Sequence, residues 1–233
     1  MSSVGNDHTC PQRGPGVELR WFNRRSGLTL VELLLVLGIV ALAAGSLGRG
    51  LLAGDPAVSL EASQRLISSL LVAARTEAAA TRTRARLLIY ADVSENEDTD
   101  KKLRFARVVR RRMDGSWDAV GAGIYLPKPA RILPSAPPPV RAGASWGSSP
   151  LSSFNGEGAI RVMVGDGGQT ARYHFIEFSP LGTMTAATLV ISPGETTDGP
   201  SPSSVIFHQP NDVRGIKLSQ YGAQTFLPDA NAF

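Results

Sequence analysis

The sequence has little of the side-chain chemistry on which most enzymes and metal proteins depend. Its 233 residues include one cysteine, Cys10, and three histidines, His8, His174 and His208. The histidines have no spacing to one another or to Cys10 that is typical of a zinc site. The chain also contains no P-loop pattern. We therefore expect no catalytic residue, no metal, no cofactor and no enzyme activity.

Aromatic residues are also scarce, at 6% of the chain, whereas glycine (24) and proline (16) are plentiful. Both residues favour turns and weaken long helices. The length fits one soluble domain in addition to a separate N-terminal region. A domain with short strands and many turns is therefore expected.

One long apolar run is present near the N-terminus. Residues 28–47 read LTLVELLLVLGIVALAAGSL, and as a helix they would be roughly 30 Å long, enough to span a bilayer. Glu32 lies inside this run, where an unpaired carboxylate costs about 2–3 kcal/mol. Such a carboxylate needs a positively charged partner, and we therefore treat Glu32 as a candidate functional residue. We predict a transmembrane helix over residues 28–48.

Residues 24–32, at the start of this run, read RRSGLTLVE. The stretch resembles the class III prepilin leader of type IV pilins and of type II secretion pseudopilins. The resemblance implies that a prepilin peptidase cleaves between Gly27 and Leu28 and methylates the new amine of Leu28. It also implies that Glu32 pairs with the amino terminus of a neighbouring subunit in a filament. A carboxylate and an ammonium cost less together in lipid than apart.

The resemblance further implies a location and a set of partners. Residues 1–27 would be a cytoplasmic leader that is cleaved off, and the rest of the chain would be a single-pass inner-membrane protein with a periplasmic C-terminal domain. The leader accounts for about half of the net charge of +4, which fits this orientation. The partners would be the peptidase, other major and minor pseudopilins, the inner-membrane assembly platform and secreted cargo.

Two other interpretations of the apolar run stay open. In one it is an ordinary secretory signal, cleaved after the A-x-A site formed by residues 41–43. In the other it is a plain membrane anchor with Glu32 near the interface. The mature N-terminus distinguishes them, because it would be Ala44 for the signal, Met1 or Ser2 for the anchor, and methylated Leu28 for the pilin-type leader.

An amphipathic helix is predicted after the apolar run, over residues 55–86. Asp55 is a good N-cap and Pro56 suits the first helical position, and the helix is expected to end near Arg84. Its apolar positions recur every three or four residues and should pack on a sheet. These positions are Leu60, Ile67, Leu70, Leu71, Ala74 and Ala78.

Residues 87–233 are predicted to form a β-rich domain. Asp114-Gly115 and residues 165–168 read as hairpin turns, and residues 127–158 read as a long loop that is mobile or a functional insert. The tail over residues 221–233 shows no periodic spacing of hydrophobic residues, and we expect it to fray. The predicted strands are 87–91, 103–111, 117–126, 159–164, 171–178, 183–192, 205–208 and 213–219.

The predicted fold class is therefore α+β: a pilin-like arrangement of a long N-terminal helix packed on an antiparallel sheet. Two further stretches, FSPLG over residues 178–182 and AARTEA over residues 73–78, resemble the H-type minor pseudopilins and the fimbrial T-type proteins (the GspH/FimT family). The function that this resemblance implies is that of a structural minor pseudopilin of a type II secretion system.

A basic stretch leaves a second function open. The arginines Arg104, Arg110 and Arg112 share strand parity. They and Arg111 form either a solvated strand edge or a surface that binds an anionic partner such as DNA. Under the second interpretation the chain would be a minor type IV pilin involved in pilus assembly or DNA uptake. Few aromatic residues flank the stretch, which argues against base stacking.

Overall fold

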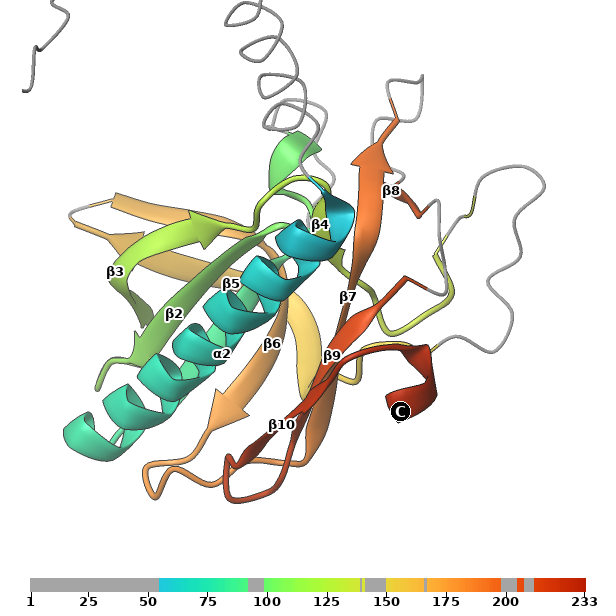
Figure 1. Ribbon diagram of the computed structural model, residues 1–233. Helices are drawn as coiled ribbons and strands as arrows, with labels where there is room; N and C mark the ends of the chain where they lie inside the picture. Colours follow the sequence, from blue (N-terminus) through green and yellow to red (C-terminus); the bar gives the residue numbers. More distant parts are fainter. Residues whose placement is uncertain are drawn as a thin grey trace, which may run out of the picture. The chain divides into compact units, whose positions relative to one another are not determined.

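One α-helix and ten strands make up the part of the chain that the computed structural model describes (Figure 1). The described residues are 55–91, 99–138, 140, 150–165, 167–197, 205–207 and 212–233. The predicted leader and membrane helix, residues 1–48, lie outside them. Within the described residues, no helix is both long and apolar enough to cross a bilayer.

The helix α2 spans Pro56–Thr81. As predicted, Asp55 caps its start, and the Asp55 carboxylate accepts a hydrogen bond of 3.0 Å from the amide of Ala57. The predicted end near Arg84 is wrong. Arg82 adopts a left-handed conformation with φ 53°, which interrupts the helical hydrogen-bond ladder and turns the chain into the first strand.

The predicted apolar face of α2 is buried, with one difference. Leu70 is only partly buried, whereas three polar side chains are buried on the same face. Among them, Gln64 donates a hydrogen bond of 2.6 Å to the carbonyl of Gly215, so its amide is satisfied. The buried residues of α2 are Ser59, Leu60, Ser63, Gln64, Ile67, Leu71, Ala74 and Ala78.

Five strands close into a ring in the order β1-β2-β3-β5-β6, because β1 pairs with both β2 and β6. All pairs are antiparallel except β3 and β5, which pair in parallel over two residues. The ring strands are β1 (Ala85–Tyr90), β2 (Phe105–Arg111), β3 (Trp117–Tyr125), β5 (Gly156–Val164) and β6 (Gly167–Phe178).

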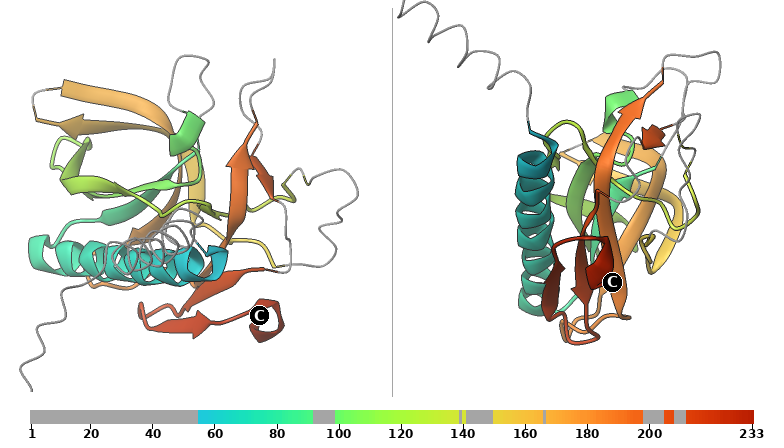
Figure 2. Two further views of the ribbon diagram at one scale, coloured as in Figure 1. Left: turned by 45° about the horizontal axis from the view of Figure 1, so that its top comes forward. Right: turned by 45° about the vertical axis from the view of Figure 1, so that its right-hand side comes forward.

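The remaining strands form a second sheet of order β10-β9-β7-β4, with β8 paired to β7. The helix α2 packs against strands of both sheets and so joins them (Figure 2). The fold is therefore α+β, with one helix on mainly antiparallel strands. The strands of this sheet are β4 (Ala130–Ile132), β7 (Ala187–Thr196), β8 (Val205–Phe207), β9 (Arg214–Leu218) and β10 (Gln224–Leu227).

Three details of the predicted strand pattern are wrong. There are two sheets where one was predicted, the strand β4 lies within the predicted loop 127–158, and β10 lies within the tail predicted to fray. A short 3-10 helix, Ala230–Ala232, follows β10. Strands of three and four residues are too short to show a period of two, and they are held by long-range pairing with β7 and β9.

Both faces of β1 are buried. Leu87 and Ile89 belong to the core between α2 and the two sheets. Leu88 and Tyr90 belong to a second core inside the ring, together with residues such as Trp117. A strand with two buried faces reads as a continuous apolar run, which is why the LLIY sequence does not alternate.

A buried cation links β4 to β7 and to the segment that precedes β2. Arg131 is 3% exposed, and its guanidinium donates to the carbonyl of Gly194 on β7 (3.1 Å) and pairs with Asp100 at 3.2 Å. It also donates to the carbonyl of Lys102. A buried guanidinium is tolerated only when its donors are satisfied in this way.

Candidate functional site

The residues of the predicted cleavage and assembly site, Gly27, Leu28 and Glu32, lie outside the described residues. Among the predicted site residues, the structure therefore describes only the four arginines Arg104, Arg110, Arg111 and Arg112. It divides the four predicted arginines between the two ends of β2.

Arg104 lies just before β2 and is largely buried, with 11% of its side chain exposed. Its guanidinium pairs with Asp100 and donates a hydrogen bond of 2.6 Å to the carbonyl of Leu126. The other three arginines lie at the far end of the seven-residue strand, about 20 Å away. The shared strand parity therefore does not bring Arg104 together with them.

Arg110 and Arg112 are held by carboxylates. Arg110 pairs with Glu77 of α2 at 3.2 Å and with Asp118 of β3 at 3.8 Å. Arg112 pairs with the same Asp118 at 2.9 Å. Arg111 points to the other face of the strand and is exposed; within the described part of the chain its side chain makes no ion pair. These carboxylates compete with any outside anion for Arg110 and Arg112.

Two further arginines join Arg111 on its face of the sheet. In the register of β1 and β2, Ala85 lies opposite Arg110, and the amide of Arg111 donates to the carbonyl of Arg84 at 2.8 Å. Arg84 and Arg111 are thus cross-strand neighbours, with Arg86 two residues further along β1. We call Arg84, Arg86 and Arg111 the arginine triad.

The helix predicted over residues 55–86 included Arg84 and Arg86. This was wrong, because both residues follow the left-handed Arg82, and Arg86 lies within β1. The alternation of arginine at positions 82, 84 and 86 is the signal that could have indicated a strand, since side chains two residues apart share one face of a sheet.

Arg86 is the fixed member of the triad. Its guanidinium lies 4.1 Å from the ring centre of Trp117 and 3.9 Å from that of Phe175, so two aromatic rings make cation–π contacts with it. Glu177 of β6 pairs with Arg86 at 2.6 Å and with Arg84 at 3.0 Å. Burial lowers the pKa of Arg86 from its usual value, but a guanidinium stays charged at neutral pH.

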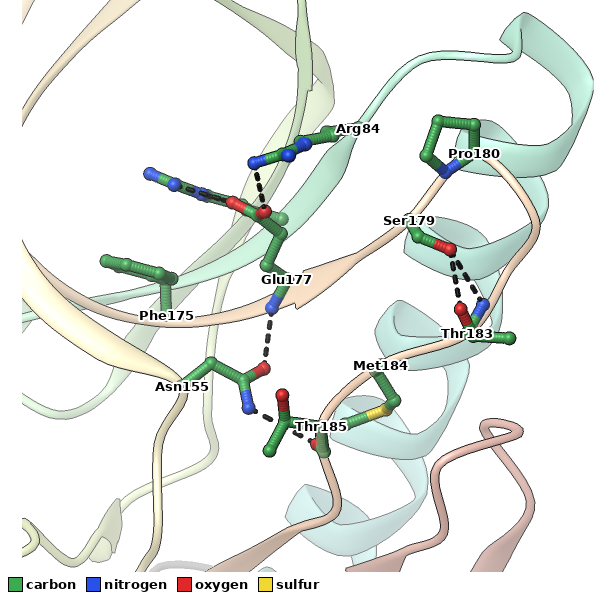
Figure 3. Close-up of a pocket in the computed structure, with 10 residues that line it drawn as sticks. Arg84, Asn155, Phe175, Glu177, Ser179, Pro180, Thr183, Met184 and Thr185 are labelled. Atoms are coloured by element: carbon green, nitrogen blue, oxygen red, sulfur yellow. Dashed lines mark hydrogen bonds and ion pairs between the residues drawn. The ribbon is translucent and has the colours of Figure 1, made fainter.

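A cavity of about 510 Å³ opens beside Arg84, Arg86 and Glu177 (Figure 3). Asn155 fixes one wall: its side chain accepts a hydrogen bond of 2.8 Å from the amide of Glu177 and donates one of 3.2 Å to the carbonyl of Thr185. The cavity is polar and open on one side, and arginine donors face it. Such a site can bind a carboxylate or another anion.

The FSPLG stretch forms the opposite wall of this cavity as a tight turn. Phe178 is buried, and the amide of Ser179 donates to the carbonyl of Thr183 at 2.8 Å. Gly182 has φ +72°, a conformation that residues with a Cβ rarely adopt. The sequence pattern therefore has a structural role in shaping the cavity.

The Phe175 ring contacts the guanidinium of Arg86 at the cavity. A substitution that moves this ring should therefore disturb Arg86 as well. A Cβ on Gly156 would lie 2.5 Å from the Phe175 ring, whereas a Cβ on Gly158 of the same strand would meet nothing within 4 Å. Gly156→Ala should displace the ring from Arg86 and lower the free energy of unfolding by about 1–3 kcal/mol. Gly158→Ala, the matched control, should change it by less than about 0.5 kcal/mol in urea unfolding. Equal effects would contradict this account.

His174 lies at a second cavity, of about 340 Å³, near the other end of β1. Its ring stacks on Phe154 with centres 4.6 Å apart, and its Nδ1 lies 3.3 Å from a carboxylate oxygen of Glu157. Burial lowers the pKa of His174, Glu157 raises it, and Arg172 and Lys102 lower it further. Among the described residues, no group of three or more His, Cys, Asp or Glu side chains could hold a metal ion.

The lowered pKa of His174 predicts a loss of stability in acid. Because the unfolded chain binds the proton more readily than the folded one, stability falls as pH drops below about 6.5 and through the folded pKa. His174→Phe keeps an aromatic ring but removes this titration. Between about pH 7.5 and pH 5.5 the variant should lose less unfolding free energy than the parent chain in urea titrations. Parallel pH profiles would show that His174 does not contribute.

No protein-family model matches the chain, and no curated protein matches its sequence. Among solved structures, two of the minor pseudopilin EpsH from the type II secretion system of Vibrio cholerae share 13% and 14% identity with it. They cover 72% and 74% of this chain and 96% of their own, with TM-scores of 0.38 and 0.40. The type IV minor pilin FimU of Pseudomonas aeruginosa shares 15% identity over 71% of this chain and 86% of its own, with a TM-score of 0.34. At these values the likeness does not assign the chain to a family.

Proposed function

We propose that the chain is a pilin-like subunit of a pilus or pseudopilus that enters a filament through its N-terminal helix. The observation that carries the proposal is the RRSGLTLVE stretch, which places a glycine before an apolar run and a carboxylate, Glu32, five residues after the cleavage point. In lipid this carboxylate requires a positive partner, and the new amine of a neighbouring subunit supplies one.

The soluble domain fits a filament subunit. The helix α2 buries only one face, against the two sheets, and its other face carries exposed apolar residues, Val58 (64% exposed) and Val72 (54%). An exposed apolar face on a long helix suits contact with other helices.

The finer assignment that we propose is a minor pseudopilin of a type II secretion system. It rests on the FSPLG and AARTEA stretches and on the likeness of the leader to pseudopilins. The chain would be cut by prepilin peptidase, methylated on Leu28 and held in the inner membrane with its sheets in the periplasm. It would assemble with other major and minor pseudopilins on the inner-membrane platform and could contact secreted cargo there.

A gene deletion in the source cell tests this assignment. Loss of the chain should leave secreted proteins in the periplasm while surface pili and DNA uptake stay normal. Restoration by the parent gene on a plasmid is the control. Normal secretion together with loss of pili or of DNA uptake would instead support a minor type IV pilin.

The arginines of the soluble domain favour this second candidate function, a minor pilin that captures DNA. Against it, Glu77 and Asp118 already form ion pairs with Arg110 and Arg112. The rings of Trp117 and Phe175 already contact the guanidinium of Arg86, so they are not open for stacking with a base. A gel-shift with the full chain in detergent decides it. DNA binding that weakens with salt and disappears with Arg110, Arg111 and Arg112 changed to Ala would support the candidate. No binding at low salt would remove it.

A further inference from the structure

We infer that two matching turns beside α2, together with Arg75, form a docking surface for an acidic segment of a partner protein. In that segment a carboxylate lies next to a large apolar side chain. The turns are residues 179–183 and 219–223, and we call them the twin turns. The surface belongs to the folded domain, so the proposal goes beyond the proposed function and does not depend on entry into a filament.

The twin turns are built in the same way. The first reads SPLGT and the second SQYGA. In each, the amide of the opening serine donates to the carbonyl of the last residue, at 2.8 and 3.0 Å. The hydroxyl of that serine accepts from the amides of the third and last residues at 3.1 to 3.3 Å. The fourth residue of each turn is a glycine with φ +72°. Each turn is therefore held in one shape by its own hydrogen bonds.

The twin turns lie side by side, and each exposes a large apolar side chain. The first turn lies between β6 and β7 and the second between β9 and β10 (Figure 1). The amide of Met184, just after the first turn, donates to the carbonyl of Gln220 in the second at 2.9 Å. Leu181 is 86% exposed and Tyr221 is 63% exposed. Neighbouring apolar side chains on rigid supports are typical of a surface that contacts a partner.

Arg75 of α2 lies against both turns. A Cβ on Gly222 would lie 2.9 Å from the Cδ of Arg75, and a Cβ on Gly182 would lie 3.3 Å from its Nε. Because glycine has no Cβ, each turn leaves room for this side chain. The AARTEA and FSPLG stretches therefore meet at this contact, and it positions the Arg75 side chain beside the exposed residues of the two turns.

The charge of Arg75 has no carboxylate partner in the part of the chain that the structure describes. Its side chain is exposed. The nearby carboxylate of Glu77 pairs instead with Arg110 of β2 at 3.2 Å, whereas Arg65 of the same helix pairs with Glu61 at 2.6 Å. A guanidinium presents five N–H donors in one plane and can bind a carboxylate through two of them. Charge complementarity therefore favours an acidic partner.

A cavity of about 510 Å³ beside Arg75 can hold an apolar side chain of that partner. It lies between α2 and the second turn, and its helical wall is made mostly of small or apolar residues, among them the exposed Val72. The volume is within the range of pockets that bind small ligands. The described residues that line it are Val72, Arg75, Thr76, Ala79, Ala80 and Gly222.

The chemistry of this surface fits a protein segment better than a membrane or a nucleic acid. Anionic membranes and nucleic acids are bound through several positive charges, but Arg75 is the only cation among the described residues that line the cavity. Arginine and tyrosine are enriched among the residues that contribute most to binding between proteins. A carboxylate on Arg75, with the adjacent apolar side chain in the cavity and against Tyr221, would use each part of the surface.

Peptide selection with the full chain in detergent tests the proposal. Random peptides displayed on phage are selected in parallel on the parent chain and on the Arg75→Gln chain. Glutamine has a helix propensity close to that of arginine, so this exposed substitution should leave α2 intact. Peptides selected on the parent chain should carry Asp or Glu next to a large apolar residue. Equal recovery on the two chains, no enrichment, or selected peptides without an acidic residue would overturn the proposal.

Fluorescence anisotropy with the best selected peptide gives a second readout. Arg75→Gln should weaken its binding about tenfold, and so should replacing the acidic residue of the peptide by its amide. Leu181→Ser combined with Tyr221→Ser should weaken it by a similar factor. Arg65→Gln, the matched control, removes another exposed arginine of α2 and should leave the affinity unchanged. Binding that Arg75→Gln does not weaken, or that Arg65→Gln weakens as much, would overturn the proposal.

A pair of glycine variants separates the positioning of Arg75 from backbone strain. Gly222 and Gly121 have φ +72° and +70°, but a Cβ on Gly121 would meet nothing within 4 Å. Alanine is strained at both positions, whereas only Gly222→Ala should displace Arg75. Peptide binding by the folded chain should therefore fall in Gly222→Ala and stay unchanged in Gly121→Ala. Equal binding by the two variants would contradict the role that we give to the twin turns.

Discussion

Glu32→Ala is expected to leave cleavage intact and to lower incorporation of the chain into filaments more than tenfold. The variant removes the carboxylate that, in our account, neutralises the amine of Leu28 on the next subunit. Breaking a pair buried in an apolar setting leaves the other charge unpaired and costs about 3–5 kcal/mol. The measurement compares the chain in sheared filaments with the chain left in the membrane, by immunoblot.

Glu32→Asp is the matched control, because it keeps the charge on a side chain that is one methylene shorter. It should restore part of the incorporation, whereas Glu32→Gln should behave like the alanine variant. Normal incorporation of Glu32→Ala would remove the pairing model. The single-anchor interpretation expects that outcome, since there Glu32 merely lies near the membrane interface.

Gly27→Leu is expected to abolish processing altogether. A glycine before the scissile bond has no Cβ, so a peptidase can approach the backbone closely, and a branched side chain there would block the approach. The full-length chain should accumulate in the membrane and be absent from filaments. An immunoblot detects the retained leader of 27 residues by its mass.

Ser26→Ala is the neighbouring control and should be processed normally, because it leaves the glycine unchanged. Cleavage of Gly27→Leu at the normal rate would mean that this glycine does not mark the processing site. Cleavage elsewhere, beside residues 41–43, would support the secretory signal instead.

The long elements of the domain could be predicted from the sequence because their signals are local. The cap formed by Asp55 and Pro56 and the three-to-four-residue spacing of apolar side chains indicated α2. The short apolar run LLIY indicated a strand. The helix end was missed by three residues because Arg82 is an unusual residue for the left-handed position that terminates it.

Other features could not be predicted because they depend on contacts distant in sequence. Ala130–Ile132 is a strand only because β7 lies beside it. The arginine triad combines β1 with β2, and its carboxylate, Glu177, comes from β6. Arg104 and Arg110 have the same parity, but a bulge between Ala106 and Val108 and the neighbouring carboxylates give them separate environments.

Mass spectrometry of the mature N-terminus tests the central claim most directly. The chain is isolated from membranes of a cell with an active prepilin peptidase, and its first peptide is identified. Our account predicts a chain that begins at Leu28 with a methyl group on its amine. A chain that retains residues 1–27, or one that begins at Ala44, would contradict it.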